Sequence, residues 1–385
     1  MLRKQRLFTP GPTPLHPAVQ EALARPILHH RTDEFRGVLK DCIAGLKAFF
    51  KTSDDVLVLA TSGTGAMEAA VVNVISPGES MLALVAGNFG ERWANIGKAY
   101  GMDVRVLEAS WGEAVRPEVV AAALDKDPQI RGVFVQLSES STGVRHDIEA
   151  LARITRSRPG TLLVVDAISG AGAMALETAA WGVDVVVVGS QKALALPPGL
   201  AFVSLSAKAW ERAEASKSPR FYLDLRRERK AQAGGKTAFT PAISHVIALK
   251  AGLDFVAANG GVDALVANAG TLAAMTRAAA NALGLPLVAP RDYGDALTAL
   301  YPPAGLDSGA IVKALKTEFG STVAGGQGLL KGKICRVAHL GYYDATDILG
   351  LLGTLEIALQ RLGHKFEPGK GLAAAQAEYL RRTAI

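Results

Sequence analysis

The chain has 385 residues, of which 49% are hydrophobic and 20% are charged, and its formal net charge is +6. This composition is typical of globular proteins and excludes disordered and collagen-like chains, and the length suggests two domains. The densest basic run, residues 226–230, has no interleaved aromatic side chains, so we expect no nucleic-acid partner.

Cysteine content and hydropathy indicate the cellular setting. Only Cys42 and Cys335 occur, far apart and without a CxxC spacing, which argues against a disulfide framework and against a zinc site. No uninterrupted apolar run approaches the roughly 20 residues that a membrane helix needs. We therefore expect a cytoplasmic protein without membrane contacts and without a bound metal.

Short apolar runs alternate with helical patterns from about residue 55 to residue 205. The runs are rich in valine and leucine on both faces, as in a mainly parallel sheet that helices cover on each side. We predict an α/β domain with a seven-stranded, mainly parallel sheet between helices. The predicted strands are residues 56–60, 81–85, 104–107, 132–137, 161–166, 183–189 and 201–205, and the predicted helices between them include 65–75 and 171–181.

The second half of the chain has a different pattern. Residues 245–283 are alanine-rich and predict one long helix or a pair of helices. The residues after Pro286 predict a smaller α+β unit, in which Asp344 is a good N-cap for the last long helix. The predicted elements of this unit are strands at 297–301 and 333–340, helices at 308–319 and 345–362, a turn at 324–328 and a helical tail at 365–385. The predicted division is an N-terminal segment at 1–20, a large domain at 21–260 and a small C-terminal domain at 261–385.

Two charged residues follow neighbouring predicted strands. Asp166 ends one strand, and Lys192 follows the next strand after one βαβ unit. In open parallel sheets ligands bind at the carboxyl ends of the strands, and both side chains should emerge at that edge. The pattern fits a reactive site, and it fits equally an ion pair that seals the strand ends.

A turn rich in hydroxyl groups and glycine follows the first predicted strand. Its sequence is Thr61-Ser62-Gly63-Thr64-Gly65, and a helical pattern begins directly after it. Unpaired amides and the dipole at a helix N-terminus attract anions, so the turn is a candidate phosphate site. It lacks the third glycine of a dinucleotide fingerprint, and the chain has no Walker A motif.

An anion site, a carboxylate and a lysine at one edge of the sheet are what pyridoxal phosphate (PLP) requires. The phosphate needs a helix N-terminus, the pyridine nitrogen needs a carboxylate, and the aldehyde needs a lysine amine for a Schiff base. PLP is therefore the expected cofactor.

Three longer motifs add a resemblance to a known family. They are Glu139-Ser140-Ser141-Thr142-Gly143, Val165-Asp166-Ala167-Ile168-Ser169 and Gly189-Ser190-Gln191-Lys192-Ala193-Leu194. Through the order and spacing of these motifs, the chain resembles the class V aminotransferases of PLP fold type I over nearly its whole length. Within that family it looks like the alanine–glyoxylate, serine–glyoxylate and serine–pyruvate aminotransferases.

The resemblance implies cofactor roles for residues of this chain. Lys192 matches the Schiff-base lysine, which also moves the substrate α-proton, and Asp166 matches the partner of the pyridine nitrogen. The other matching cofactor contacts are Ser62, Gly63, Thr64 and Gln191 toward the phosphate, Phe89 stacked on the pyridine, and Ser140 with Thr142 toward the phenolic oxygen. Phe89 departs from the family pattern, which often has tryptophan there.

The resemblance also implies how substrates and a second subunit bind. Arg336 lies in an otherwise apolar predicted strand and matches the arginine that binds the substrate carboxylate through paired hydrogen bonds. Gly11, near the start of the resemblance, is a second candidate substrate contact. Thr237 and Thr240 match residues that reach a neighbouring subunit's phosphate, which implies a homodimer with shared active sites; Thr237 stands where the family can have tyrosine.

The expected reaction is a ping-pong transamination from a small amino acid, alanine or serine, to a small 2-oxo acid, glyoxylate or pyruvate. Two alternatives stay open. One is another substrate or reaction on the same cofactor, such as a 2-aminoethylphosphonate transaminase or a lyase, and the other is a PLP-binding subunit without turnover. Desulfurase chemistry is disfavoured, because Gln191 stands where the desulfurases have a histidine and Cys335 lies in a predicted strand.

Overall fold

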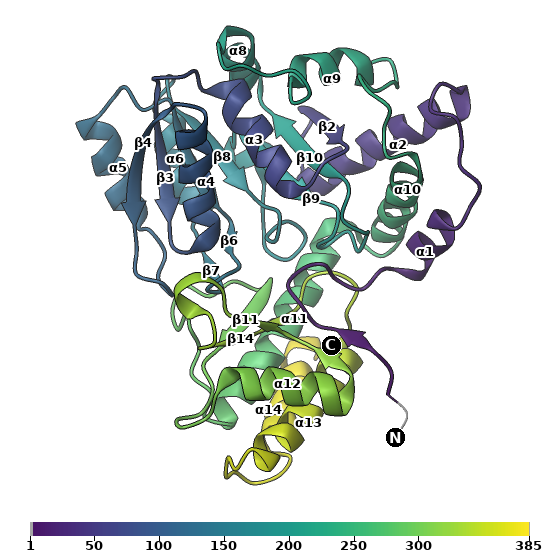
Figure 1. Cartoon of the computed structure of the whole chain (residues 1–385), viewed down its shortest axis with the longest axis vertical. Helices are drawn as coiled ribbons and strands as arrows, with labels where there is room; N and C mark the ends of the chain where they lie inside the picture. Colours follow the sequence, from purple (N-terminus) through teal and green to yellow (C-terminus); the bar gives the residue numbers. More distant parts are fainter. Residues whose placement is uncertain (1–2, 385) are drawn as a thin grey trace.

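The computed structural model describes residues 3–384, and its upper part in Figure 1 is built on one large sheet. All seven predicted strands are confirmed and lie in this sheet in the order β2-β10-β9-β8-β5-β3-β4. Their bounds are β2 (Asp55–Leu59), β3 (Ser80–Val85), β4 (Asp103–Glu108), β5 (Gly132–Gln136), β8 (Leu162–Asp166), β9 (Val185–Gly189) and β10 (Ala201–Leu205). β10 runs antiparallel to both of its neighbours, and the other pairings are parallel, so the mainly parallel sheet is also confirmed.

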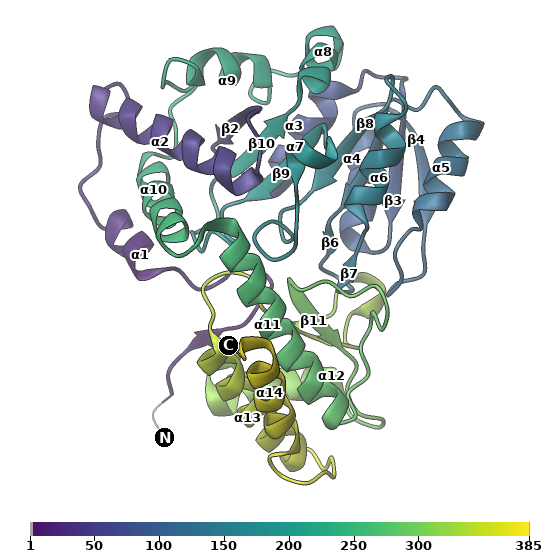
Figure 2. The ribbon, with the colours of Figure 1, turned by 180° about the vertical axis from the view of Figure 1, so that it is seen from behind.

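Helices cover both faces of the large sheet. Two buried clusters alternate along the strands: one packs the sheet against α3, α4 and α8, and the other packs it against α2, α5 and α6. Figures 1 and 2 show these two helical layers from opposite sides. The bounds are α2 (Asp33–Phe50), α3 (Gly63–Val74), α4 (Asn88–Ala99), α5 (Pro117–Lys126), α6 (Ile148–Arg156) and α8 (Ala207–Ala215). Because both faces are covered, β5, β8 and β9 are buried along their whole lengths, which explains their continuous apolar sequences.

The predicted helix at 171–181 is wrong for most of its length. Only α7 (Thr178–Trp181) is helical, and the residues between β8 and α7 form tight turns. Gly172 has a φ of 74°, and a Cβ there would lie 2.7 Å from the Cβ of Ala193. The alanine-rich run has helix propensity, but the close approach to Ala193 requires a turn at glycine. The short connection still brings β8 and β9 together as parallel neighbours.

The predicted pair of helices leads from the upper part of the molecule into the lower part (Figures 1 and 2). Asn259 and Gly260 separate α10 (Ile243–Ala258) from α11 (Gly261–Ala282), and Gly260 and Gly261 both have positive φ. α11 runs from the upper into the lower part of the molecule (Figure 2). The lower part holds a small antiparallel sheet and three helices. They are β11 (Leu297–Leu300), β13 (Ala324–Gly325), β14 (Cys335–Ala338), α12 (Ser308–Phe319), α13 (Ala345–Arg361) and α14 (Lys370–Thr383). Asp344 caps α13 as predicted, and the division of the chain at residue 260 stays a prediction.

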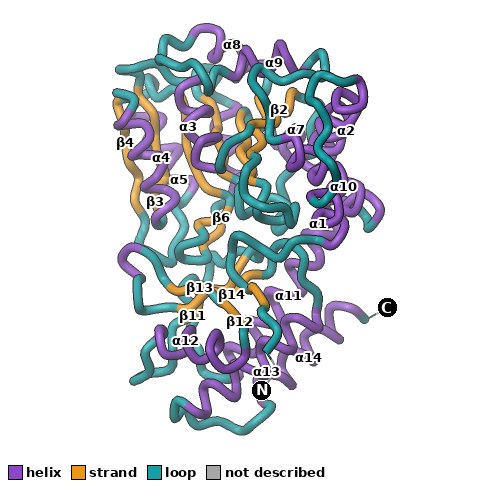
Figure 3. The backbone as a smooth tube through the Cα atoms, turned by 45° about the vertical axis from the view of Figure 1, so that its right-hand side comes forward, coloured by secondary structure: helices purple, strands orange, loops and turns teal. Residues whose placement is uncertain are grey.

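The N-terminal segment joins the two parts. β1 (Arg6–Leu7) pairs with β12 (Ser321–Thr322) in the lower part, and the chain then crosses to α1 (Pro17–Leu23), which packs against α10. A short hairpin of β6 (Ser138–Glu139) and β7 (Val144–Arg145) extends from the large sheet toward β11, β13 and β14, as Figure 3 shows. Within residues 3–384, no helix combines the length and the apolarity that a membrane crossing requires.

Candidate active site

Asp166 and Lys192 lie at the carboxyl edge of the large sheet, as predicted. Asp166 is the last residue of β8, and Lys192 follows the end of the adjacent parallel strand β9. The N-terminal segment covers the lysine: Lys192 Nζ donates a hydrogen bond to the carbonyl oxygen of Pro10 at 2.5 Å, and Thr13 Oγ1 donates to the carbonyl oxygen of Lys192 at 2.9 Å. The topology therefore brings the two candidate catalytic side chains to one place.

The two side chains do not seal each other in an ion pair. Asp166 is 5% exposed, and its Oδ1 accepts the amide of Ile168 at 2.8 Å. No ion pair joins Asp166 to Lys192 in the described chain, although each charge acts on the pKa of the other. This geometry does not fit the structural ion pair, and the catalytic roles of both side chains stay predictions.

Burial shifts both groups toward neutrality. Desolvation raises the pKa of Asp166 to about 6 and lowers the pKa of Lys192 to about 8, where the charge of Asp166 opposes the shift. An amine with such a pKa is partly unprotonated near neutral pH, which is the form that attacks a carbonyl or accepts a proton. Perturbed pKa values of this kind cluster at functional sites.

The turn before α3 has the geometry of an anion site. Ser62 is the N-cap of α3, and its Oγ accepts the amide of Gly65 at 3.3 Å. The amides of Gly63 and Thr64 are in the first helical turn, where the helix supplies no acceptor. A Cβ on Gly63 would lie 2.6 Å from Ile168 Cδ1, so the turn packs against the residue two positions after Asp166. The predicted phosphate turn and Asp166 therefore belong to one site.

Gln191 offers a second polar group beside Lys192. The Oε1 end of its side-chain amide is buried and has no hydrogen-bond partner among residues 3–384. Buried polar atoms are normally paired, and an amide can present its oxygen or its NH₂ group to a ligand. This orphaned group fits the predicted contact to a bound molecule.

Phe89, in the helix after β3, and residues 140–142, between β6 and β7, supply the remaining predicted cofactor contacts. Phe89 lies in the first turn of α4, and the guanidinium of Arg92 lies 4.8 Å from its ring centroid. The Ser140 hydroxyl has only a long contact of 3.5 Å to the carbonyl of Ser138, whereas the Thr142 hydroxyl contacts two backbone carbonyls at 3.3 and 3.4 Å. Ser140 is thus freer to bind a ligand than Thr142, and the cofactor roles of all three predicted residues stay predictions.

Arg336 is a buried cation without a carboxylate partner. It lies in β14 and is 6% exposed, and burial lowers its pKa while the charge of Glu139 opposes that shift. Its Nε donates to the carbonyl of Gly325 at 2.9 Å and its Nη1 donates to the carbonyl of Ser140 at 2.6 Å. No acidic side chain forms an ion pair with it in the described residues. A buried unpaired charge costs free energy, so an anionic ligand would stabilise this arginine.

Gly11 lies directly against the catalytic candidate. Its φ is 138°, and a Cβ at this position would overlap Lys192 Nζ and lie 2.7 Å from Lys192 Cδ. Any side chain here would displace the lysine, so the glycine provides clearance for it. Its predicted contact with substrate stays a prediction.

Thr237 and Thr240 are not brought to the site within one chain. They lie in the loop between α9 (Leu225–Gln232) and α10, where Thr237 Oγ1 donates to the carbonyl of Phe239 at 2.6 Å. Neither hydroxyl forms a hydrogen bond with Lys192, Asp166 or the 61–65 turn. Their predicted contact with a second subunit's phosphate stays a prediction.

Two residues at the site were missed by the sequence analysis. Arg92 Nη1 donates to Thr64 Oγ1 at 3.1 Å and so links α4 to the phosphate turn. Its signal in the sequence was its position three residues after Phe89, on the same helical face. Glu139, which stood in a quoted motif without a role, accepts the amide of Phe89 at 3.0 Å.

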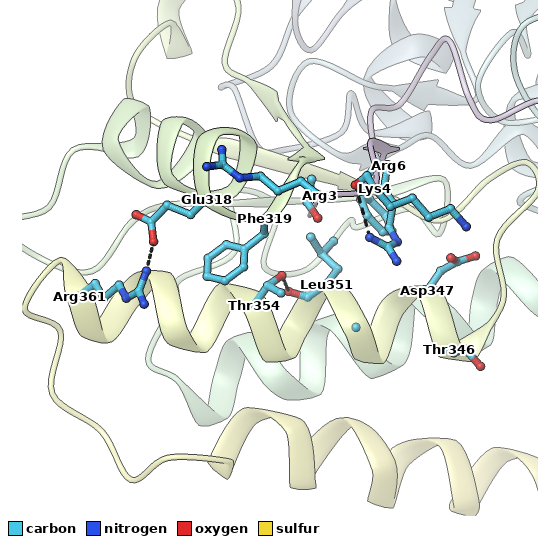
Figure 4. Close-up of a pocket in the computed structure, with 13 residues that line it drawn as sticks. Arg3, Lys4, Arg6, Glu318, Phe319, Thr346, Asp347, Leu351, Thr354 and Arg361 are labelled. Carbon is cyan, nitrogen blue, oxygen red and sulfur yellow. Dashed lines mark hydrogen bonds and ion pairs between the residues drawn. The ribbon is translucent and has the colours of Figure 1, made fainter. Parts of the chain in front are cut away.

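A separate cavity of about 820 Å³ lies away from these residues. Figure 4 shows it between the N-terminal segment, α12 and α13, with Arg3, Lys4 and Arg6 on one side and Phe319 and Leu351 in its wall. Arg361 in this wall forms an ion pair with Glu318. None of the candidate catalytic or cofactor residues lines this cavity.

Comparison with known proteins agrees with the geometry. The sequence model of the family described as "Aminotransferase class-V" matches residues 18–328. A relative from a Synechococcus species, named the small subunit of a soluble hydrogenase, is 40% identical over 97% of this chain and 98% of its own length. The serine–glyoxylate aminotransferase of Hyphomicrobium methylovorum is 34% identical over 98% of this chain and 95% of its own.

A solved structure is similar over most of the fold. The aspartate aminotransferase of subgroup IV from Thermus thermophilus superposes with a TM-score of 0.87 at 39% sequence identity. The match covers 93% of this chain and 99% of that protein.

Proposed function

This chain belongs to the class V aminotransferases, which are PLP-dependent enzymes of fold type I, and we propose that it transfers the amino group of alanine or serine to glyoxylate or pyruvate by a ping-pong mechanism. One observation carries this proposal. Lys192 and Asp166 lie at the carboxyl edge of the large sheet, and Arg336 of β14 is close enough for its charge, like that of Asp166, to act on Lys192. No ion pair among the described residues neutralises any of the three. The name of the Hyphomicrobium relative supports serine and glyoxylate as substrates.

The residues present fit PLP. The first-turn amides of α3 and the orphaned amide of Gln191 suit a phosphate, the Asp166 carboxylate suits the pyridine nitrogen, and the Lys192 amine suits the aldehyde. Bound there, the cofactor supplies an electron sink for the bonds of the substrate α-carbon.

Each side chain has a chemical role in this mechanism. The Lys192 amine, with a pKa of about 8, would take the proton from the substrate α-carbon and deliver it to the cofactor carbon C4′. Asp166, with a pKa of about 6, is mostly ionised at pH 7 and would stabilise a positive charge on the cofactor's ring nitrogen. Arg336 binds the carboxylate of the amino acid in the first half-reaction and of the oxo acid in the second, so both substrates present the α-carbon in the same orientation.

An exposed aromatic cluster supports a homodimer with shared sites. Phe221 and Tyr222 are 66% and 47% exposed, and their rings lie 5.8 and 5.1 Å from the ring of Phe239, which stands between Thr237 and Thr240 in the chain. The Tyr222 hydroxyl donates to the carbonyl of Ala60, next to the phosphate turn. Exposed aromatic groups of this kind favour protein interfaces.

We propose that this dimer is cytoplasmic, in keeping with two unpaired, buried cysteines.

The test is an absorbance titration of the purified protein with PLP, then with alanine or serine, and then with glyoxylate. We expect a visible band that falls with the amino acid and returns with glyoxylate. Borohydride should reduce the Schiff base, which abolishes the band and leaves the cofactor covalently attached to the protein. A band that ignores every small amino acid would overturn the proposed substrates while keeping the cofactor. A folded protein that gives no band would overturn the assignment of the site.

The Synechococcus relative favours a second candidate, a PLP-binding subunit of a larger assembly. The same titration separates the two. A subunit without turnover would form the band and retain it through every addition, whereas an aminotransferase would cycle.

A further inference from the structure

The start of α4 is capped by a residue from a distant segment. Gly87 occupies the N-cap and has no side chain to bind the free amides of the first turn, one of which belongs to Phe89. Glu139, in β6, acts as the capping side chain instead. Its Oε2 accepts the amide of Phe89 at 3.0 Å and the amide of Gly90 at 2.9 Å. β6 lies beside the beginning of α4 in Figure 1.

Ser141 extends this cap to a third amide. Its hydroxyl accepts the amide of Asn88 at 3.1 Å and donates to Glu139 Oε1 at 2.6 Å, while the Ser141 amide also donates to Oε1 at 3.2 Å. Three consecutive amides of α4 therefore end on one carboxylate, directly or through one hydroxyl. A Cβ on Gly87 would lie 2.8 Å from Glu139 Cγ and Cδ, so the glycine leaves room for this arrangement.

Glu139 is held by hydrogen bonds alone. Its side chain is 0% exposed, and no cation forms an ion pair with it among the described residues. Burial raises its pKa, and the four hydrogen bonds oppose that rise. Buried carboxylates are expensive to keep and are tolerated when every oxygen is bonded, which makes the geometry around this one specific.

The same loop also reaches the substrate arginine. Ser140 lies between Glu139 and Ser141, and its carbonyl oxygen accepts Arg336 Nη1 at 2.6 Å. Glu139 therefore ties together the backbone of the stacking candidate Phe89, the loop of Ser140 and the support of Arg336. We propose that Glu139 is the positioning residue that sets these three groups relative to one another, a role that rests on the proposed function.

The experiment compares three variants of the full-length protein. Glu139→Ala removes all four hydrogen bonds. Glu139→Gln keeps the shape, because its oxygen can accept the amides of Phe89 and Gly90 and its NH₂ can donate to Ser141 Oγ. The matched control is Glu356→Ala: Glu356 is a carboxylate 6% exposed that accepts the amides of Gly369 and Leu372 at 2.7 and 2.8 Å at the start of α14.

Three readouts separate positioning from general stability. They are the dissociation constant of PLP, the visible circular dichroism of the bound cofactor, and hydrogen exchange at residues 88–90 of the cofactor-free protein. For Glu139→Ala we expect PLP binding weaker by roughly tenfold or more, altered circular dichroism, faster exchange and a higher KM for both substrates, since several buried bonds to a charged group are lost. For Glu139→Gln we expect binding within about threefold of the wild type, since the bonds to α4 are retained.

The Glu356→Ala control shows whether weaker PLP binding comes from lost positioning or from lower stability in general. Glu356→Ala should lower the melting temperature and leave PLP affinity and circular dichroism unchanged. The proposal is overturned if Glu139→Ala binds PLP as the wild type does, or if Glu356→Ala weakens PLP equally. Should Glu139→Ala fail to fold, Glu139→Asp, which keeps the charge but is one methylene shorter, must weaken PLP and alter the circular dichroism, and wild-type values would overturn the proposal. A wild-type protein that binds no PLP would overturn the proposed function itself, and this role with it.

Discussion

The two ends of the large sheet each hold an aspartate and a lysine, and the two pairs differ. At the amino end, Asp184 stands just before β9 and forms an ion pair of 3.4 Å with Lys208 of α8. Asp184 also accepts the amide of Leu163 at 2.9 Å and the hydroxyl of Ser206 at 3.0 Å. Both oxygens of this carboxylate therefore have partners within the protein.

At the carboxyl end, the aspartate and the lysine have fewer hydrogen-bond partners and no ion pair between them. Asp166 accepts one backbone amide, Lys192 donates to one backbone carbonyl, and no ion pair joins them. The comparison shows that residue type and burial alone do not distinguish a structural pair from a candidate reactive pair. What separates them is whether the surrounding protein satisfies the charges, because an unsatisfied buried group is stabilised by binding a ligand.

Removing the lysines should give the largest contrast. Lys192→Met should lower transaminase turnover by roughly 1000-fold or more, because the amine that forms and breaks covalent bonds is lost. Lys208→Met should keep turnover and lose about 1 kcal/mol of stability, because it breaks a partly exposed ion pair. Steady-state kinetics and urea unfolding of both variants measure the two effects. Equal losses of turnover would show that the two ends do not differ in this way.

Neutralising the aspartates should give a smaller contrast. Asp166→Asn should lower kcat by roughly 100- to 1000-fold, since asparagine cannot hold a positive charge on the ring nitrogen. Asp184→Asn should leave kcat within about threefold and destabilise the protein by about 1–3 kcal/mol, since its single oxygen cannot serve all the partners of Asp184. The comparison fails if Asp184→Asn reduces kcat as strongly as Asp166→Asn.

The pH dependence of stability should give the smallest effect. The pKa of Lys192 in the folded chain, about 8, is below its ordinary value of 10.5, so its stabilising contribution is complete above pH 10.5 and is lost as the pH falls through 8. At pH 7 the cofactor-free Lys192→Met variant should therefore be more stable than the wild type by about 1–2 kcal/mol, after allowance for partial exposure. Urea unfolding at pH 7, 8.5 and 9.5 should show this difference shrinking as the pH rises. A difference that is constant with pH would contradict the assigned shift.

Much of the fold could be predicted because its signals are local. The seven strands are continuous apolar runs, and the pair α10 and α11 and the cap at Asp344 follow from periodicity and from a single residue type. The predicted helix at 171–181 failed because its alanine content favours a helix locally, whereas contact between Gly172 and Ala193 requires a turn. That contact is between residues on successive connections, and no local pattern reports it.

Residue types and their positions along the chain were enough to predict which side chains could do the chemistry. Asp166 and Lys192 follow adjacent strands, and Arg336 is a charge in an apolar strand. Folding alone settled that Asp166 and Lys192 stay unpaired, that Arg336 has no carboxylate partner in the described residues, and that Glu139 caps α4 from fifty residues away. The physical reason is that pairing and desolvation depend on distances between segments that only the folded chain brings together.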